Sequence, residues 1–148
     1  MAGNLTIYTL ALQNTCKALI DWSSANIRTV LLTSSYTPDA TATGHSTWAD
    51  VSTYQVSGTG YTAGGLAVAS PSVTSSASTV SASYGTLSWP SSTITCRYMV
   101  LVLSTGGATP NSTDKILCYD DLGSGSNIST TNGTLTINGY TVSITHSP

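Results

Sequence analysis

Side chains that could carry out acid–base or nucleophilic chemistry are scarce in this sequence. It holds six aspartates, no glutamate and two histidines, His45 in a polar stretch and His146 near the end. General acid–base catalysis needs titratable groups held close together at tuned pKa values, and a nucleophilic serine needs a neighbouring base. The spacing at Gly123–Ser126 approaches a nucleophile elbow but falls in a predicted loop. We therefore expect no enzymatic activity, and we expect both histidines to be solvated.

Aspartate and cysteine could also hold a metal, but their spacing favours structural roles. Asp120-Asp121 precede a Gly/Ser loop that could offer oxygen ligands to Ca²⁺. The regular Asp-x-Asp-x-Asp-Gly alternation is absent, so capping of turn N–H groups is the favoured interpretation. Cys16, Cys96 and Cys118 include no Cys-x-x-Cys pair, which leaves a zinc site without support. Three buried free thiols are favoured over one disulfide plus a free thiol, and we expect no metal and no cofactor.

Aromatic residues are the remaining candidates for a binding site. Trp48 and Tyr54 lie in polar stretches, which favours their exposure, and Tyr61 follows in a glycine-rich segment. Exposed aromatic side chains anchor protein interfaces, and a cluster of them can also stack on sugars. We expect Trp48, Tyr54 and Tyr61 to be partner-contact residues, whereas Trp89 and Tyr98 are expected to pack in the core.

The charge content excludes several classes of partner. Asp, Glu, Lys and Arg make up 7% of the chain, against roughly 25% in typical domains. Four scattered basic residues cannot attract a phosphate backbone, so we expect no nucleic-acid binding. No run approaches the roughly 18 apolar residues of a membrane span, and no secretory signal is visible. A net charge of −2 gives weak colloidal repulsion, so we expect a homo-oligomer or docking on a larger assembly.

Apolar spacing predicts one helix followed by many strands. Intervals of three and four between apolar residues indicate a helix over residues 8–20. A further short helix is expected at Thr47–Ser52, capped by Thr47 or Ser46. Pro90 should end a strand because it cannot donate a ladder hydrogen bond. The predicted strands are Ile27–Leu32, parts of 66–74 and 78–89, Thr93–Leu103 and Lys115–Tyr119.

The clearest local signal lies near the end of the sequence. Thr134–Ile137 and Tyr140–Ile144 alternate polar and apolar residues around Asn138-Gly139. Asn-Gly between two alternating runs is the strongest short-range signal for a β-hairpin. Several short strands separated by turn clusters predict a mainly β fold, an antiparallel β-sandwich or barrel with one N-terminal helix. We expect residues 1–148 to form a single domain.

Several segments of the sequence resemble small virion proteins of tailed bacteriophages. They include VLLTSSYTPD at 30–39, VSGTGYTAGG at 56–65 and WPSSTITCRY at 89–98, with shorter matches at 12–20, 50–52 and 130–137. The resemblance covers most of the chain and includes no catalytic residue. Departures are the low charge content and Cys96, which stands where a small apolar residue is expected. Such proteins are generally encoded among head and tail genes, and the resemblance implies a capsid decoration (cement) or similar accessory role.

The resemblance and the composition together predict a function with alternatives. We expect a virion structural protein, made in the host cytoplasm, that binds the major capsid protein or other virion proteins. A decoration protein can bind through hydrogen bonds and apolar contacts, and repetition on a symmetric shell multiplies weak contacts. The alternatives are a carbohydrate- or receptor-binding module of a tail fibre or baseplate, and a head–tail or tail structural component.

Overall fold

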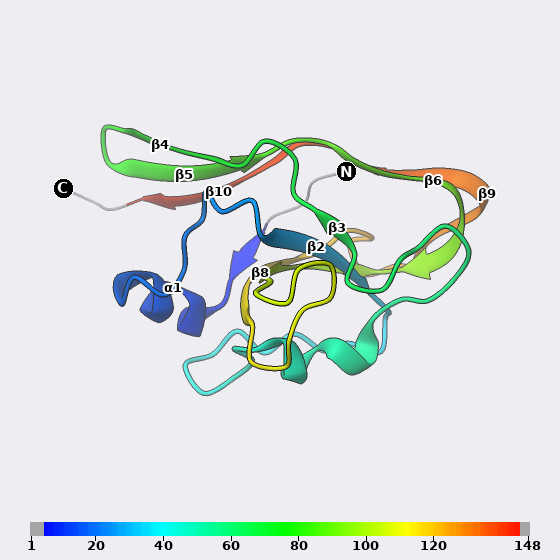
Figure 1. The fold of residues 1–148 in the computed structure, drawn as a ribbon, viewed down its shortest axis with the longest axis horizontal. Helices are drawn as coiled ribbons and strands as arrows, with labels where there is room; N and C mark the ends of the chain where they lie inside the picture. Colours follow the sequence, from blue (N-terminus) through cyan, green and yellow to red (C-terminus); the bar gives the residue numbers. More distant parts are fainter. Residues whose placement is uncertain (1–4, 146–148) are drawn as a thin grey trace.

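A five-stranded antiparallel sheet forms the base of the fold (Figure 1). In this computed structural model, which describes residues 5–145, its strands run in the order β1-β8-β7-β2-β3. Their bounds are Thr6–Ile7 for β1, Ile27–Leu32 for β2, Leu66–Ala67 for β3, Tyr98–Leu103 for β7 and Lys115–Asp121 for β8. Strands β2 and β7 pair without interruption in the middle of the sheet. Both are almost entirely buried, which is why their sequences are nearly unbroken runs of apolar residues.

A long two-stranded ribbon arches over this base sheet. One side of the ribbon is β5 (Thr79–Tyr84) followed by β6 (Leu87–Cys96). The other side is β9 (Ile128–Ile137) followed by β10 (Tyr140–Thr145). Strand β5 pairs antiparallel with β10, and β6 pairs antiparallel with β9. In Figure 1 the ribbon crosses the top of the molecule and curls down at its β6–β9 end.

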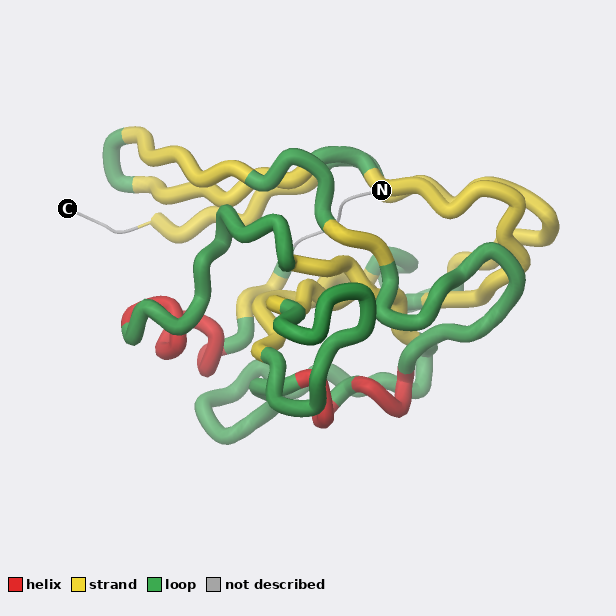
Figure 2. The backbone as a smooth tube through the Cα atoms, viewed as in Figure 1, coloured by secondary structure: helices red, strands yellow, loops and turns green. Residues whose placement is uncertain are grey.

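A third strand widens the other end of the ribbon. Strand β4 (Ser72–Ser76) pairs antiparallel with β5, which gives a three-stranded sheet in the order β10-β5-β4. We call this three-stranded sheet the wing, because it projects beyond the base sheet in Figure 1. Figure 2 shows strands in two layers, with loops and short helices gathered below the base sheet. The predicted antiparallel, sandwich-like β fold with one N-terminal α-helix is confirmed.

The hairpin predicted at Asn138-Gly139 is wrong. Strands β9 and β10 do not pair with each other, because each pairs with a different strand of the opposite side of the ribbon. Neither Asn138 nor Gly139 has the positive φ that a two-residue hairpin turn of this kind requires. Glycine is favoured at position 139 for another reason. A Cβ atom there would lie only 3.0 Å from the carbonyl oxygen of Tyr84, so a larger residue would crowd the backbone of the opposite strand. The two residues therefore form a break in a continuing ribbon.

The ribbon also runs through Pro90, where the sequence predicts a strand end. Pro90 lies inside β6, and the register with β9 shifts between Trp89 and Ser92. A bulge is one of the few places where a sheet accepts proline, because the ladder is already interrupted there. The single strand predicted at Thr93–Leu103 is in turn divided at Arg97, whose N–H donates to a β2 carbonyl at 3.0 Å. The chain passes at this point from the ribbon into the base sheet.

The N-terminal helix is shorter than the predicted 8–20. Helix α1 covers Thr9–Cys16. The N–H groups of Ala18 and Leu19 donate to carbonyls of the last helical turn at 3.0 and 2.9 Å, the pattern of a Schellman stop. Ala18 has a φ of +56°, a conformation that glycine adopts at lower cost. The apolar intervals that suggested a longer helix continue past this stop, but the helix does not.

The helix buries only a small part of its surface. Tyr8, just before α1, and Ala11 are buried, whereas Leu12 and Leu19 are exposed. Helical periodicity predicts an apolar stripe that faces the core, and here that stripe is left largely uncovered. Helix α1 lies beneath the wing, at the left of Figure 1.

The core lies on both faces of the base sheet, under the ribbon on one side and against the loops on the other. Trp89 from the ribbon is 2% exposed and Tyr98 from the base sheet is 6% exposed, so both residues predicted for the core are confirmed there. A buried hydrogen bond of 2.7 Å joins the hydroxyl groups of Thr29 in β2 and Tyr140 in β10. Because buried polar groups need partners, this hydrogen bond ties β10 of the ribbon to β2 of the base sheet.

Candidate interaction site

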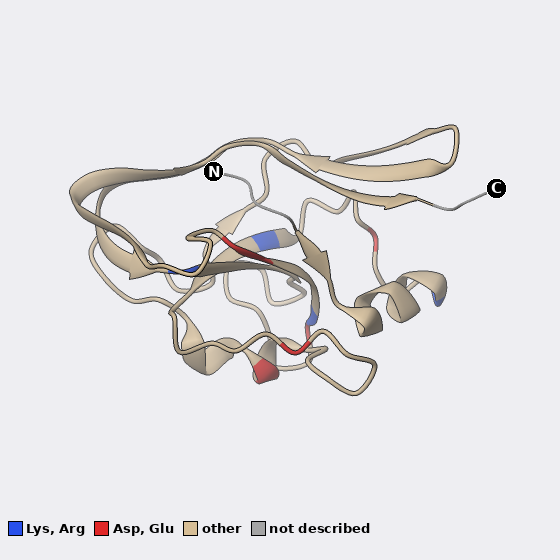
Figure 3. Ribbon diagram, turned by 180° about the vertical axis from the view of Figure 1, so that it is seen from behind, with Lys and Arg blue, Asp and Glu red and all other residues tan. Residues whose placement is uncertain are grey.

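The ribbon and the wing carry no charged side chain. Residues 51–96 and 122–145 contain no Asp, Glu, Lys or Arg, and they include every strand of both elements. Figure 3 shows the blue and red segments confined to the base sheet, the end of α1, a short helical turn and the loops. A surface of this kind neither attracts nor repels a partner over long distances. Any contact that it makes depends on hydrogen bonds and apolar burial.

The two faces of the wing differ sharply in chemistry. One face displays hydroxyl groups that pair across β5 and β10, at 3.0 Å for Thr79–Thr145, 2.8 Å for Ser81–Ser143 and 3.0 Å for Ser83–Thr141. The residues between them point to the opposite face because side chains alternate along a strand. Apart from Ser75, that opposite face is apolar, and its aliphatic residues are Val73, Val80, Ala82, Val142 and Ile144.

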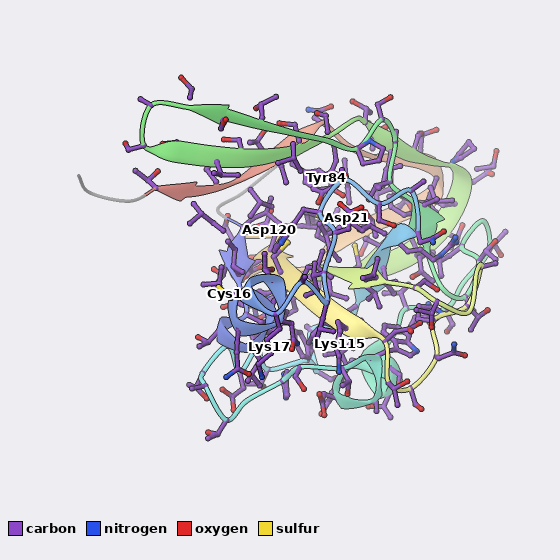
Figure 4. The ribbon with its side chains drawn as sticks, turned by 60° about the vertical axis from the view of Figure 1, so that its left-hand side comes forward. Cys16, Lys17, Asp21, Tyr84, Lys115 and Asp120 are labelled. Atoms are coloured by element: carbon purple, nitrogen blue, oxygen red, sulfur yellow. The ribbon has the colours of Figure 1, made fainter. Side chains whose placement is uncertain are left out.

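An apolar groove of about 390 Å³ lies under this face of the wing. Its other wall is the end of α1 and the segment that follows the helix. Figure 4 shows Asp21 on that segment, with Cys16 and Lys17 at the end of α1 below the wing. The lining consists of Thr15, Ile20, Asp21, Trp22 and Ser23 on the body, and Val73, Val80, Ala82, Val142 and Ile144 on the wing. We call this feature the wing groove.

The wing groove gathers apolar side chains that the fold leaves exposed. Val80 is 48% exposed, Val73 is 45% exposed and Ile144 is 41% exposed. The other large hydrophobic side chains that are exposed within residues 5–145 are Leu12 and Leu19, in and just after α1. Contiguous exposed apolar surface marks protein or ligand contact sites more often than isolated exposed residues do. The groove is therefore the strongest candidate for an interaction site.

Hydrogen bonds hold the inner end of the wing groove in a fixed shape. The Tyr84 hydroxyl in the wing donates to the Trp22 carbonyl at 2.9 Å, and Figure 4 shows Tyr84 beside this segment. The Trp22 indole N–H donates to the Thr15 hydroxyl of α1 at 2.9 Å. The Tyr84 and Tyr140 rings also pack together, with centroids 5.2 Å apart. These contacts join the wing, α1 and the segment after α1, so the groove has a defined shape before any partner binds.

One charged residue lines the wing groove. The carboxylate of Asp21 accepts hydrogen bonds from the Ser23 N–H at 2.9 Å and from the Ser23 hydroxyl at 2.6 Å. These bonds stabilise the ionised form and lower the pKa of Asp21. Asp21 therefore stays negatively charged at neutral pH, at the rim of an otherwise uncharged groove.

The aromatic residues predicted for partner contact lie elsewhere. Tyr54 packs on Tyr36 with ring centroids 5.5 Å apart. Tyr61 stacks on Trp89 at 6.4 Å, and its hydroxyl accepts the Leu31 N–H at 3.1 Å. Both tyrosines are only partly exposed, and neither lines the wing groove.

The predicted exposure of Trp48 is wrong, because its side chain is only 6% exposed. The short helix expected around it is present as two 3-10 turns, Trp48–Asp50 and Ser52–Tyr54. The Asp50 carboxylate accepts the Thr47 N–H at 2.8 Å and caps the first turn. This turn directs the indole inward, so the polar neighbours in the sequence give no guide to its burial.

The residues that form the wing groove were visible in the sequence only as alternation. Val80 and Ala82, and Val142 and Ile144, stand at intervals of two, which marks one face of a strand. The same alternation would be seen whether that face were covered by the core or open to a partner. Sequence reasoning therefore identified the strands but missed the site.

Several other titratable groups are held in structural hydrogen bonds. His45 is partly buried rather than solvated, and its Nδ1 lies 3.2 Å from the Tyr36 hydroxyl. The Asp121 carboxylate pairs with Arg97 at 2.8 Å and accepts the Gly125 N–H at 3.1 Å, the capping role that the sequence favoured. His146 lies outside the described residues. Within residues 5–145 no group of three or more His, Cys, Asp or Glu is placed to share a metal.

The expectation of three buried thiols is correct for two of them. Cys96 and Cys118 are buried and free, whereas Cys16 is free but exposed at the end of α1. Burial raises the pKa of Cys96 to about 11 and also raises that of Cys118. The thiolate is the nucleophilic form, so neither buried cysteine is reactive at neutral pH.

Comparison with known proteins leaves the site as the main guide to function. No family model matches the chain, and no curated protein and no solved structure matches it. In the part of the chain that the structure describes, no helix is long and apolar enough to cross a membrane.

Proposed function

We propose that this protein is a structural component of a tailed-bacteriophage particle that decorates the capsid by binding the major capsid protein. It acts by binding and not by catalysis. The observation that carries the proposal is the wing groove, a preformed apolar site at one end of an uncharged ribbon. The resemblance of segments across most of the chain to small phage virion proteins supplies the class of particle.

The wing groove suits an apolar segment of a shell subunit. Full burial of a Val or Ile side chain contributes roughly 1.5–3 kcal/mol. The wing residues Val73, Val80 and Ile144 have two-fifths to half of their side chains exposed, so covering them contributes about 1 kcal/mol each. About 3 kcal/mol from this contact gives weak binding by a single copy, since association itself costs several kcal/mol.

A symmetric shell compensates for weak individual contacts. Repeated sites raise the effective concentration of each further contact, so avidity can exceed single-site affinity by about two to four orders of magnitude. The absence of charge on the ribbon favours dense binding on a shell, because neighbouring copies do not repel one another. A decoration protein of this kind would stabilise the shell by clamping adjacent subunits.

The test compares particles assembled with and without the protein. If it is a cement, shells that lack it should rupture at a lower temperature or a milder osmotic shock, and added purified protein should restore resistance. Equal survival of the two kinds of shell would contradict the proposal. The alternative of a sugar-binding tail module gains no support from Trp48, Tyr54 and Tyr61, because they form no exposed aromatic platform.

A further inference from the structure

The outer edge of the wing ends in an unpaired strand. Strand β4 lies at the end of the order β10-β5-β4, and among the described residues no other strand pairs with its outer side. All five of its residues, Ser72–Ser76, are exposed. An edge strand presents backbone N–H and C=O groups that can pair with a strand of another chain.

Strand β4 lacks the features that normally prevent such pairing. Natural edge strands are protected by charged residues, proline, bulges or a covering segment. The sequence of β4 is Ser-Val-Thr-Ser-Ser, with neither a charge nor a proline, and it pairs with β5 in one unbroken register. The nearest charged residues along the chain are Asp50 and Arg97.

We propose that two copies of this protein associate by antiparallel pairing of their β4 strands about a twofold axis at Thr74. The product is a six-stranded sheet in the order β10-β5-β4-β4-β5-β10. A second copy fits this edge because the whole wing is uncharged, so a twofold contact brings no like charges together. On a charged surface, a twofold contact would place like charges of the two copies next to each other and weaken the dimer.

The alternation of β4 selects the register. Val73 and Ser75 stand opposite Ala82 and Val80 on the apolar face of the wing, while Thr74 stands opposite Ser81 on the hydroxyl face. Pairing centred on Thr74 places Val73 opposite Ser75 of the second copy and keeps both apolar faces on one side of the joint sheet. A shift of the pairing by one residue would bring an apolar face next to a hydroxyl face.

This arrangement has consequences for both surfaces. The two wing grooves open on the same side of the joint sheet, so the dimer presents two apolar sites to one partner surface. On the other side, Thr74 meets Thr74 of the second copy and extends the row of cross-strand hydroxyl pairs. Thr–Thr pairs of this kind stabilise antiparallel strands. The pairing does not rest on the phage proposal, and the purified chain is enough to test it.

The first test measures association by sedimentation velocity over a wide range of concentration. The wild-type chain should form a dimer whose population rises with concentration and changes little with salt, because no charge is involved. Thr74→Lys places two like charges at the axis and should leave the protein monomeric, with part of the dimer restored by high salt. Ser88→Lys adds the same charge at an exposed position of β6 and should dimerise as the wild type does. A chain that is monomeric throughout, or a dimer unaffected by Thr74→Lys, would overturn the proposal.

The second test locates the axis by disulfide formation and does not depend on the charge variants. Directly opposed residues of antiparallel strands have Cα atoms about 4.5–5.5 Å apart, within the range of about 4.4–6.8 Å that a disulfide needs. Thr74→Cys in a Cys16→Ser background should therefore give a covalent dimer under mild oxidation. Ser76→Cys in the same background is the control, because its two copies would be about 14 Å apart along the strands. Equal cross-linking at both positions, or at position 76 alone, would overturn the assigned axis.

Discussion

The most informative perturbation makes the wing groove polar without changing its shape. Replacing Val73 and Val80 by Thr is nearly isosteric, and Ile144→Thr keeps a β-branched side chain on β10. The two-fifths to half of each side chain that is exposed contributes about 1 kcal/mol when a partner covers it. The triple variant should therefore bind about 3 kcal/mol more weakly, which is roughly a hundredfold in the dissociation constant.

The assay is co-sedimentation of purified protein with shells that lack it, at increasing protein concentration. The folded state should survive, because these side chains are already partly hydrated and each substitution should lower the free energy of unfolding by less than about 1 kcal/mol. The matched control is Ser83→Ala with Thr141→Val, which removes a hydroxyl pair on the opposite face and should leave binding unchanged. If the triple variant folds and binds shells as tightly as the wild type, the assignment of the wing groove as the docking site is refuted.

Three further predictions concern the chain alone. Ala18→Gly should raise the free energy of unfolding by about 1 kcal/mol in denaturant titration, because Ala18 holds a φ of +56° at the end of α1; an unchanged or lower value would contradict the assigned helix stop. A thiol reagent should label Cys16 alone in the folded protein and also Cys96 and Cys118 after unfolding, whereas three equally fast thiols would contradict the burial. Burial raises the pKa of Tyr36 to about 12, above its unfolded value of about 10, so its contribution to stability is complete below pH 10 and is lost as the pH rises towards 12. Absorbance titration of tyrosine alongside alkaline unfolding tests this, and a Tyr36→Phe variant with an unchanged alkaline transition would contradict it.

The sequence predicted the central strands of the base sheet well because burial leaves a direct mark on composition. Strands β2 and β7 are covered on both faces, and their apolar runs are visible without knowledge of their partners. The helix was predicted at the right place but too long, since its end depends on one residue, Ala18, that adopts an unusual backbone conformation without being glycine.

Pairing between strands was the part that local patterns could not predict. Asn138-Gly139 has the composition of a hairpin turn, yet the strands on either side pair with residues about 60 and 50 positions away, as in Tyr140 opposite Tyr84 and Ile137 opposite Leu87. These long-range pairs bury Tyr84, Leu87, Ile137 and Tyr140, which a two-stranded hairpin on its own would leave exposed.

The interaction site could not be predicted from the sequence for a related reason. Trp48 seemed exposed because its neighbours are polar, but a short 3-10 turn directs it into the core. Val80 and Ile144 stand at alternating apolar positions of strands, and the wing projects beyond the base sheet and leaves them uncovered. Whether a side chain is exposed depends on how the layers of the fold pack together, so it cannot be predicted from one segment of the sequence.

The measurement that tests the central claim most directly is quantitative mass spectrometry of purified phage particles, giving copies of this protein per major capsid subunit. A capsid decoration protein should be present at a ratio near one or at a simple lattice fraction such as one third, because it follows the symmetry of the shell. A count of only a few to a few dozen copies per particle, or the absence of the protein from purified particles, would contradict the proposed role.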